Sequence, residues 1–213
     1  MTFSIVAYDP QSEAWGVAVQ SKFVAIGALT PWAKAGVGAI ATQAWINTTY
    51  GSRGLELLAR GLSPTATIAH LTGEDEGRAH RQVGMIGIRG EAATYTGEAC
   101  PPWAGGLVGR NYACQGNFMI GDAPILAMAQ SFEMAQGPLW DCLLAALVAG
   151  QEAGGDKRGQ QSAALLVVQA GAGFRGFNDR VIDLRVDDHP TPIVELQRIL
   201  QVRLADTTWS AGG

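Results

Sequence analysis

The sequence has no long apolar run, little charge and no excess of basic residues. No apolar stretch approaches the ~18 residues of a membrane-spanning helix, and the start lacks the basic-then-apolar order of a signal peptide. Only 16% of the 213 residues are charged, and the formal net charge is −4. Because the basic residues are scattered, we expect no nucleic-acid and no membrane partner.

Cysteine is also scarce. Cys100, Cys114 and Cys142 are widely spaced and form no C-x-x-C pair. An odd number of cysteines without an export signal predicts reduced thiols and a cytoplasmic protein. A nucleophilic cysteine would need a histidine partner that the sequence does not place, so we expect three small buried residues.

What the sequence does have is enough apolar material for a sizeable core. Hydrophobic residues make up 47% of the chain, and the 28 glycines follow no repeat period. We expect a single domain over residues 1–205 and a frayed carboxyl-terminal tail over residues 206–213.

The amino-terminal stretch predicts a hairpin. Residues 2–8 alternate in hydropathy as a strand with a buried face does, residues 9–12 have turn chemistry, and residues 15–20 form a second strand. Antiparallel pairing across this turn places Thr2 opposite Gln20 or Ser21, with Lys22 next in the chain.

Thr2 has two interpretations. Removal of Met1 would give it a free α-amino group, whose ordinary pKa of ~7.7–8.0 suits a general base at neutral pH. Thr2 would then supply both nucleophile and base. The alternative is that Thr2 merely opens an edge strand, which these residues alone favour.

The remaining pattern predicts a layered α+β domain. Strands that come mostly as hairpins predict largely antiparallel sheets with helices on the outer faces. We expect strands at 36–44, 82–89, 92–96, 112–120, 162–170 and 181–186, and helices at 48–60, 64–72, 123–135, 138–152 and from Pro190 onward.

Two charged clusters could carry chemistry. Asp156, Lys157 and Arg158 lie between glycines, which suits binding of an anionic group, or else a solvated connection with an internal salt bridge. The second cluster, Asp187-Asp188-His189, suits a divalent cation weakly, and helix capping or ion pairing with Arg185 is the favoured interpretation. We expect no metal and no cofactor.

Five motifs together resemble the uncharacterised DUF1028 family over residues 2–204. They are Thr2-Phe3-Ser4-Ile5-Val6-Ala7, Gly16-Val17-Ala18-Val19-x-Ser21-Lys22, Gly36-Val37-Gly38-Ala39-x-Ala41-Thr42-Gln43, Gly155-Asp156-Lys157-Arg158-Gly159 with Gln161-Ser162-Ala163-Ala164, and Asp183-Leu184-Arg185-Val186-Asp187-Asp188-His189. That family is grouped with the N-terminal nucleophile (Ntn) hydrolases, so the resemblance implies a four-layer α-β-β-α sandwich of two mainly antiparallel sheets.

The resemblance also implies roles for residues. Thr2 would be the nucleophile. Lys34 lies about as far beyond Thr2 as the lysine of proteasome β subunits lies beyond their threonine, and Lys22 is its rival. Thr42 or Gln43 would form the oxyanion site. The sequence departs from proteasome-type sites where Gln20-Ser21 replaces an aspartate.

The first hypothesis is therefore an Ntn-type amidohydrolase that cleaves a small amide or peptide bond with Thr2. Asp156, Lys157, Arg158 or Arg185 would orient a substrate carboxylate. A non-catalytic binding or assembly module of the same fold is the alternative, and a metal-assisted hydrolase using Asp187, Asp188 and His189 is a weaker one. We expect a homodimer or higher homo-oligomer.

Overall fold

Two antiparallel sheets face each other in the computed structural model, which describes residues 2–209. The six-stranded sheet has the order β10-β9-β2-β1-β8-β7, and the four-stranded sheet has the order β3-β4-β5-β6. The strands of the larger sheet are β1 (Thr2–Asp9), β2 (Ala14–Ser21), β7 (Gly105–Gly109), β8 (Tyr112–Asn117), β9 (Ser162–Val168) and β10 (Arg180–Val186). Those of the smaller sheet are β3 (Pro31–Lys34), β4 (Gly38–Ala44), β5 (Arg81–Ile86) and β6 (Ala92–Thr96).

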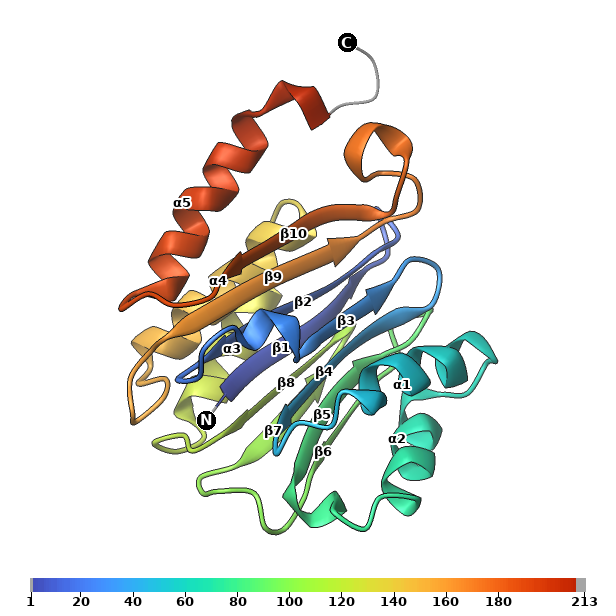
Figure 1. Ribbon diagram of the computed structural model, residues 1–213, viewed down its shortest axis with the longest axis vertical. Coiled ribbons are helices and arrows are strands. Elements are labelled where there is room, and N and C mark those ends of the chain that lie inside the picture. Colours follow the sequence, from blue (N-terminus) through green and yellow to red (C-terminus); the bar gives the residue numbers. More distant parts are fainter. Residues whose placement is uncertain (1, 210–213) are drawn as a thin grey trace.

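Helices cover both outer faces of the paired sheets (Figure 1). On the smaller sheet lie α1 (Thr49–Ala59) and α2 (Pro64–Gly73). On the larger sheet lie α3 (Ala123–Met134), α4 (Leu139–Glu152) and α5 (Pro192–Ala205). The result is the layered α+β domain that the sequence pattern predicted, in the form of the four-layer α-β-β-α sandwich that the family resemblance implied.

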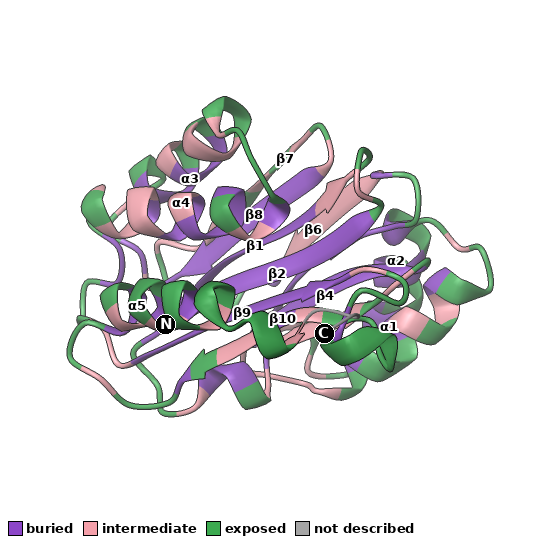
Figure 2. Ribbon diagram, turned by 90° about the horizontal axis from the view of Figure 1, so that it is seen from above, coloured by how far each residue is buried: buried purple, intermediate pink, exposed green. Residues whose placement is uncertain are grey.

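The alternation of side chains in β1 explains why it is buried on both faces. Phe3, Ile5 and Ala7 pack into the core under α3, α4 and α5. Val6 joins the core between the two sheets, and Ser4 is fully buried on that same side. Figure 2 shows the central strands β1, β2 and β4 buried along most of their length. A strand enclosed in this way holds its first residue in a fixed place.

The predicted amino-terminal hairpin is confirmed. In the observed register Thr2 pairs with Ser21, and Phe3 pairs with Gln20. β8 pairs with β1 on its other side and places Asn117 opposite Thr2. Thr2 therefore opens a central strand and not an edge strand.

The short strands β3 and β7 were not predicted, because each carries few of the β-branched and aromatic residues that mark a strand. Beyond α5, Thr207–Trp209 forms a 3₁₀ turn in which Trp209 packs on Phe174 and Arg203. Positions 210–213 of the predicted tail, and Met1, lie outside the described residues. No helix within the described part of the chain is long and apolar enough to span a membrane.

Candidate functional site

Thr2 lies at the end of the sandwich where β1 begins, and the residue is 4% exposed. Its Oγ1 lies 3.0 Å from the Oγ of Ser21, its partner across the β1–β2 pair. Ser21 itself is fully buried. Two hydroxyl groups therefore meet at the start of the chain, held by strand pairing on a rigid sheet.

A buried chain of polar side chains lies behind this pair, between the two sheets. Gln115 Nε2 donates to Ser4 Oγ at 2.6 Å, and Ser4 Oγ donates to Gln43 Oε1 at 2.6 Å. Gln43 Nε2 donates to Gln82 Oε1 at 2.8 Å, and Asn117 Nδ2 donates to the same oxygen at 2.9 Å. Buried amides bonded to one another fix both sheets relative to Thr2.

The predicted oxyanion residues do not have that role in this geometry. Gln43 Nε2 already donates to Gln82, to the carbonyl oxygen of Thr2 at 3.3 Å and to the carbonyl oxygen of Gln115 at 3.4 Å. Gln43 therefore binds the Thr2 backbone from the side of the buried polar layer between the two sheets. The side chain of Thr42 points to the opposite face of β4 from that of Gln43, and its hydroxyl donates to the carbonyl oxygen of Asn47.

Lys22 and Asp156 flank the hydroxyl pair. The backbone N–H of Lys22, next after Ser21, donates to Asp156 Oδ2 at 3.3 Å, and the Lys22 ammonium donates to the carbonyl oxygen of Gln160 at 3.2 Å. Asp156 reaches this place through an isolated β-bridge with Met119. A carboxylate therefore stands beside the end of β2, supplied by a distant segment of the chain.

Asp156 is a buried acid, with 5% of the residue exposed. Its Oδ1 accepts the backbone N–H of Arg158 at 2.7 Å, and the Arg158 guanidinium lies 3.4 Å away. Burial raises the pKa of Asp156 to about 6, against the lowering effect of the N–H groups of Arg158 and Lys22 and of nearby lysine charge. The Asp156 carboxyl group is therefore enclosed by its own segment, and the predicted role of orienting a substrate passes to its exposed neighbours Lys157 and Arg158.

The two basic neighbours of Asp156 do reach the surface. The Arg158 guanidinium lies 4.5 Å from the centre of the Phe118 ring, and the Lys157 ammonium lies 5.9 Å from it. Lys157 also donates to the carbonyl oxygen of Pro102 at 3.1 Å. The loop after β6, the end of β8 and residues 156–158 thus meet beside Thr2.

The structure does not bring Lys34 or Arg185 to Thr2. Lys34 pairs with Gly38 at the far end of β4, about 16 Å along the strand from Gln43. It lies against α1 beside Ser52 and Glu56. Arg185 lies on β10, which β9 and β2 separate from β1, and it pairs with Asp183 at 3.4 Å. Lys34 falls at the other end of its sheet, which spacing along the chain does not reveal. Arg185 is level with Ser4 through Ala164 and Val19, but it lies three strands away from β1.

The Asp187-Asp188-His189 cluster has structural partners. Asp188 Oδ1 accepts from Gln161 Nε2 at 3.1 Å, and His189 Nδ1 accepts the backbone N–H of Thr191 at 3.0 Å, just before α5. Among residues 2–209 no group of three or more His, Cys, Asp or Glu side chains is arranged to hold a metal ion. The metal-assisted alternative therefore has no support in this geometry.

Comparison with known proteins places the chain in a family. Residues 2–196 match DUF1028, described as a family of unknown function. The chain belongs to the DUF1028 family. A crystal structure of a DUF1028 protein from Silicibacter pomeroyi is similar at 30% identity and a TM-score of 0.89, covering 97% of this chain and 88% of that one. Anbu, an ancestral β-subunit from Yersinia bercovieri, aligns at 11% identity and a TM-score of 0.43, covering 96% and 94%. Among curated proteins, none matches.

The three cysteines of this DUF1028 chain are free and buried, as predicted. Burial is the main cause that raises the pKa of Cys100, of Cys114 and of Cys142. A raised pKa keeps a thiol protonated at neutral pH, and a protonated thiol is a poor nucleophile. The three cysteines are therefore poor candidates for a nucleophile.

Sequence reasoning missed the polar layer and the aromatic contact in this DUF1028 protein. Gln43, Gln82 and Gln115 each interrupt an otherwise apolar or small-residue strand, and that interruption was a usable signal. Phe118 gave no such signal, because its place under Arg158 depends on a left-handed backbone at φ 56° just after β8.

Proposed function

We propose that this protein is an Ntn-type amidohydrolase that cleaves a small amide or peptide bond with Thr2 as its amino-terminal nucleophile, after removal of Met1. The observation that carries the proposal is the 3.0 Å contact between Thr2 Oγ1 and Ser21 Oγ at the start of a central strand. Pairing of β1 with β2 and β8 holds this end of the chain in a fixed place.

In this reaction Thr2 supplies both the nucleophile and the general base. The free α-amine of Thr2 accepts the hydroxyl proton as Oγ1 attacks the amide carbonyl carbon. The carbon–nitrogen bond of the substrate then breaks, the amine product leaves with that proton, and an ester remains on Thr2. The same amine then takes a proton from water as the water oxygen attacks the ester carbonyl carbon. The bond between that carbon and Oγ1 breaks, the proton returns to Oγ1, and the carboxylic acid product leaves. Ser21 Oγ orients Thr2 Oγ1 in both steps, and Gln43 holds the Thr2 carbonyl.

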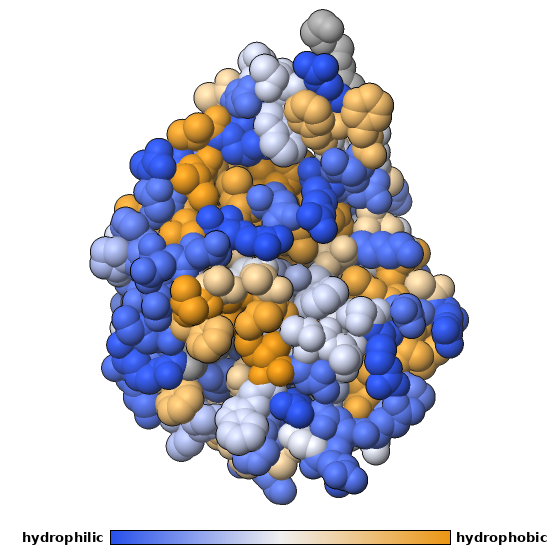
Figure 3. Space-filling view, viewed as in Figure 1, coloured by the Kyte–Doolittle hydropathy of each residue, from blue (hydrophilic) through white to orange (hydrophobic). Residues whose placement is uncertain are grey.

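The surface around Thr2 favours a substrate with an acidic group and an apolar part. Lys157 and Arg158 present positive charge over the Phe118 ring. Phe23 and Val24, which follow Lys22, are 49% and 51% exposed. Figure 3 shows apolar surface near the middle of this face, where the short turn after β2 lies in Figure 1. A carboxylate on the substrate would meet Arg158.

A mass measurement followed by chemical labelling tests the proposal. Protein from its native host should have lost one methionine, and an epoxyketone, which reacts with a hydroxyl and the adjacent free amine of one residue, should form an adduct that maps to Thr2. Retained Met1 would leave no amino-terminal base, and a mature chain without an adduct at Thr2 would equally overturn the proposal.

A non-catalytic binding or assembly module is the second candidate. The observation that favours it is the burial of Thr2, whose hydroxyl already has a hydrogen-bond partner. The same experiment separates the two, because a module of this kind keeps Met1 or leaves Thr2 unreactive.

We further propose self-association through the outer helical layer and a cytoplasmic location. Leu126 and Met134 on α3 are 49% and 74% exposed, which gives the outer helical layer apolar surface that a second copy would cover. Light scattering over a wide concentration range should give at least the mass of a dimer, and a constant monomer mass would refute this. The three free cysteines are consistent with a reducing compartment.

A further inference from the structure

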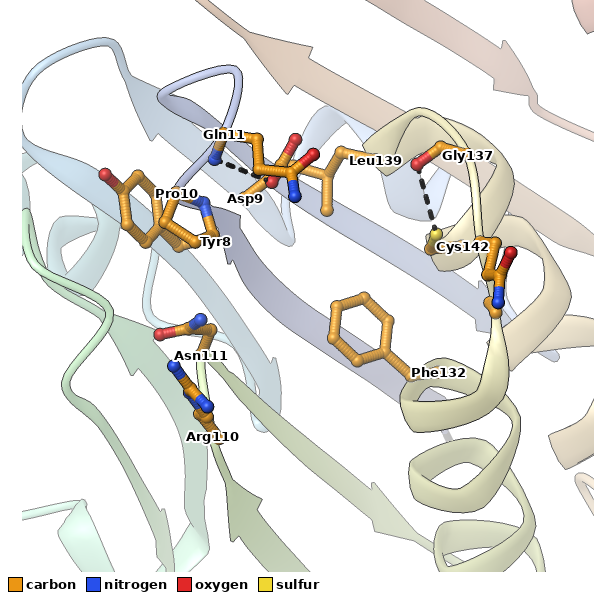
Figure 4. A pocket seen from close by; sticks show the side chains of 12 residues that line it. Tyr8, Asp9, Pro10, Gln11, Arg110, Asn111, Phe132, Gly137, Leu139 and Cys142 are labelled. Atoms are coloured by element: carbon orange, nitrogen blue, oxygen red, sulfur yellow. Dashed lines mark hydrogen bonds between the residues drawn. The ribbon is translucent and has the colours of Figure 1, made fainter.

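A cavity of about 460 Å³ opens at the opposite end of β1 from Thr2. Tyr8 and Asp9, the last residues of β1, form one side, and Phe132 from α3 with Leu139 and Cys142 from α4 form another (Figure 4). β1 spans eight residues, so the cavity lies roughly 20 Å from Thr2. The volume is in the range of sites for small molecules.

The walls of this cavity are held in place by contacts outside it. The Tyr8 ring stacks on Trp15 with centroids 4.8 Å apart, and Trp15 Nε1 donates to the carbonyl oxygen of Gly87 at 3.0 Å. The Phe132 ring lies 5.1 Å from that of Tyr112. Tyr112 is fixed in turn by a 2.7 Å hydrogen bond from its hydroxyl to Glu133. Aromatic walls that are already ordered lose little entropy on binding.

A tight turn carries a charged side chain to the rim. Arg110 and Asn111 connect β7 to β8, where Gly109 pairs with Tyr112. Asn111 has a left-handed backbone at φ 65°, and its carbonyl oxygen accepts the backbone N–H of Tyr8 at 2.9 Å. The turn that carries Arg110 is therefore tied to β1 at the edge of the cavity (Figure 4).

The two charged residues that line the cavity have opposite signs and do not pair. Arg110 has no ion-pair partner among residues 2–209, and neither has Asp9. The Asp9 carboxylate accepts the backbone N–H groups of Gln11 and Ser12 and the Ser12 hydroxyl. Because each carboxylate oxygen has two acceptor sites, Asp9 retains capacity for another donor.

We propose that this cavity binds a small zwitterion with an apolar body, of the chemical class of an apolar amino acid. Arg110 takes the carboxylate through its fork of N–H donors, and Asp9 takes the ammonium. The apolar body lies against Phe132, Leu139 and Cys142. This site is separate from Thr2, and the proposal stands whether or not Thr2 is a nucleophile.

Isothermal titration of the full chain with three probes tests the assignment. L-Phenylalanine should bind more tightly than benzoate, which lacks the ammonium group, and more tightly than phenethylamine, which lacks the carboxylate. We expect a difference of about tenfold for each missing charge, the size of one charge-assisted hydrogen bond. Equal binding of all three probes, or no phenylalanine binding at millimolar concentration, would overturn the proposal.

Matched variants locate the binding. Arg110→Ala should weaken phenylalanine and benzoate binding but leave phenethylamine binding unchanged, and Asp9→Asn should weaken phenylalanine and phenethylamine binding but not benzoate binding. Arg89→Ala, an exposed arginine on the β5–β6 turn, and Asp179→Asn, an exposed aspartate that accepts a loop N–H, are the controls. Circular dichroism checks the fold of each variant. If a control and its matched variant behave alike, the ligand binds elsewhere.

Discussion

Thr2 and Ser21, nineteen positions apart in the chain, share a buried hydrogen bond of 3.0 Å between their hydroxyl oxygens. The contact follows directly from the β1–β2 register, in which the two residues are opposite each other. Because Ser21 is fully buried, its hydroxyl has few other positions available. The Ser21 hydroxyl therefore restrains the direction in which the Thr2 hydroxyl points.

Thr2→Ala is expected to abolish epoxyketone labelling at the amino terminus, whereas Thr2→Ser should retain it. Ser21→Ala should slow labelling about tenfold, the effect of one lost hydrogen bond on a rate. Labelling kinetics followed by mass spectrometry measure both changes. Thr49→Ala, on an exposed helix start, is the control and should label at the normal rate.

Gln82→Leu is expected to destabilise the fold strongly. Gln82 accepts from Gln43 and Asn117 and donates to Thr96 Oγ1 at 2.9 Å. Each buried group left without a partner costs roughly 1–3 kcal/mol of unfolding free energy. Urea denaturation measures the loss, and Gln201→Leu on the exposed side of α5 should change stability far less. Equal effects would mean that the buried polar layer adds nothing.

Stability should depend on pH through Asp156. Its pKa is raised to about 6 in the folded state from 3.8, because burial disfavours the charged form. The folded state therefore holds the proton more tightly than the unfolded state, and stability is lost as pH rises from about 4 to about 6, by roughly 2–3 kcal/mol.

Denaturation curves of Asp156→Asn and of the unaltered protein check this across that pH window. The variant should lack the decline, so its stability relative to the unaltered protein should rise with pH. Asp206→Asn is a control of opposite sign, because hydrogen bonds from Thr208 lower the pKa of Asp206. Its carboxylate stabilises the fold above pH ~4 and loses that effect on further acidification. Parallel curves for Asp156→Asn would contradict the prediction.

Gly51→Ala should weaken the packing of α1 on β3. A methyl group at Gly51 would lie 2.2 Å from the Trp32 ring, closer than side chains approach. Overpacking of this kind costs about 1–3 kcal/mol. Gly73→Ala, at the end of α2 with no atom within 4 Å, is the matched control and should be neutral or slightly stabilising. Thermal denaturation of both variants measures the difference.

The fold was largely predictable from local patterns. Alternating hydropathy predicted the β1–β2 hairpin, and its turn chemistry predicted the register to within a residue. The Leu139–Glu152 helix had an apolar stripe that predicted its position to within one residue at its start. What no local pattern contains is the pairing of β1 with β8, which joins residues more than a hundred positions apart.

The candidate site was predictable only where strand pairing decides it. Thr2, Ser21 and Lys22 follow from one hairpin. The position of Asp156 depends on a single β-bridge to Met119. The position of Lys34 depends on which end of β4 lies near Thr2. Spacing along the chain predicts neither. The burial of Asp156 and its N–H donors from Lys22 and Arg158 likewise depend on tertiary contacts that the local glycine-rich pattern does not contain.

The enclosure of β1 between β2 and β8 also governs how the molecule can be handled. An affinity tag or fluorescent fusion before Thr2 would mask its amine. α5 ends at the opposite end of the molecule from the start of β1 (Figure 1). Purification tags and dyes should therefore be attached after α5. A protein with an amino-terminal extension would show no reaction at Thr2 in a labelling assay, even if the residues around Thr2 are correctly arranged.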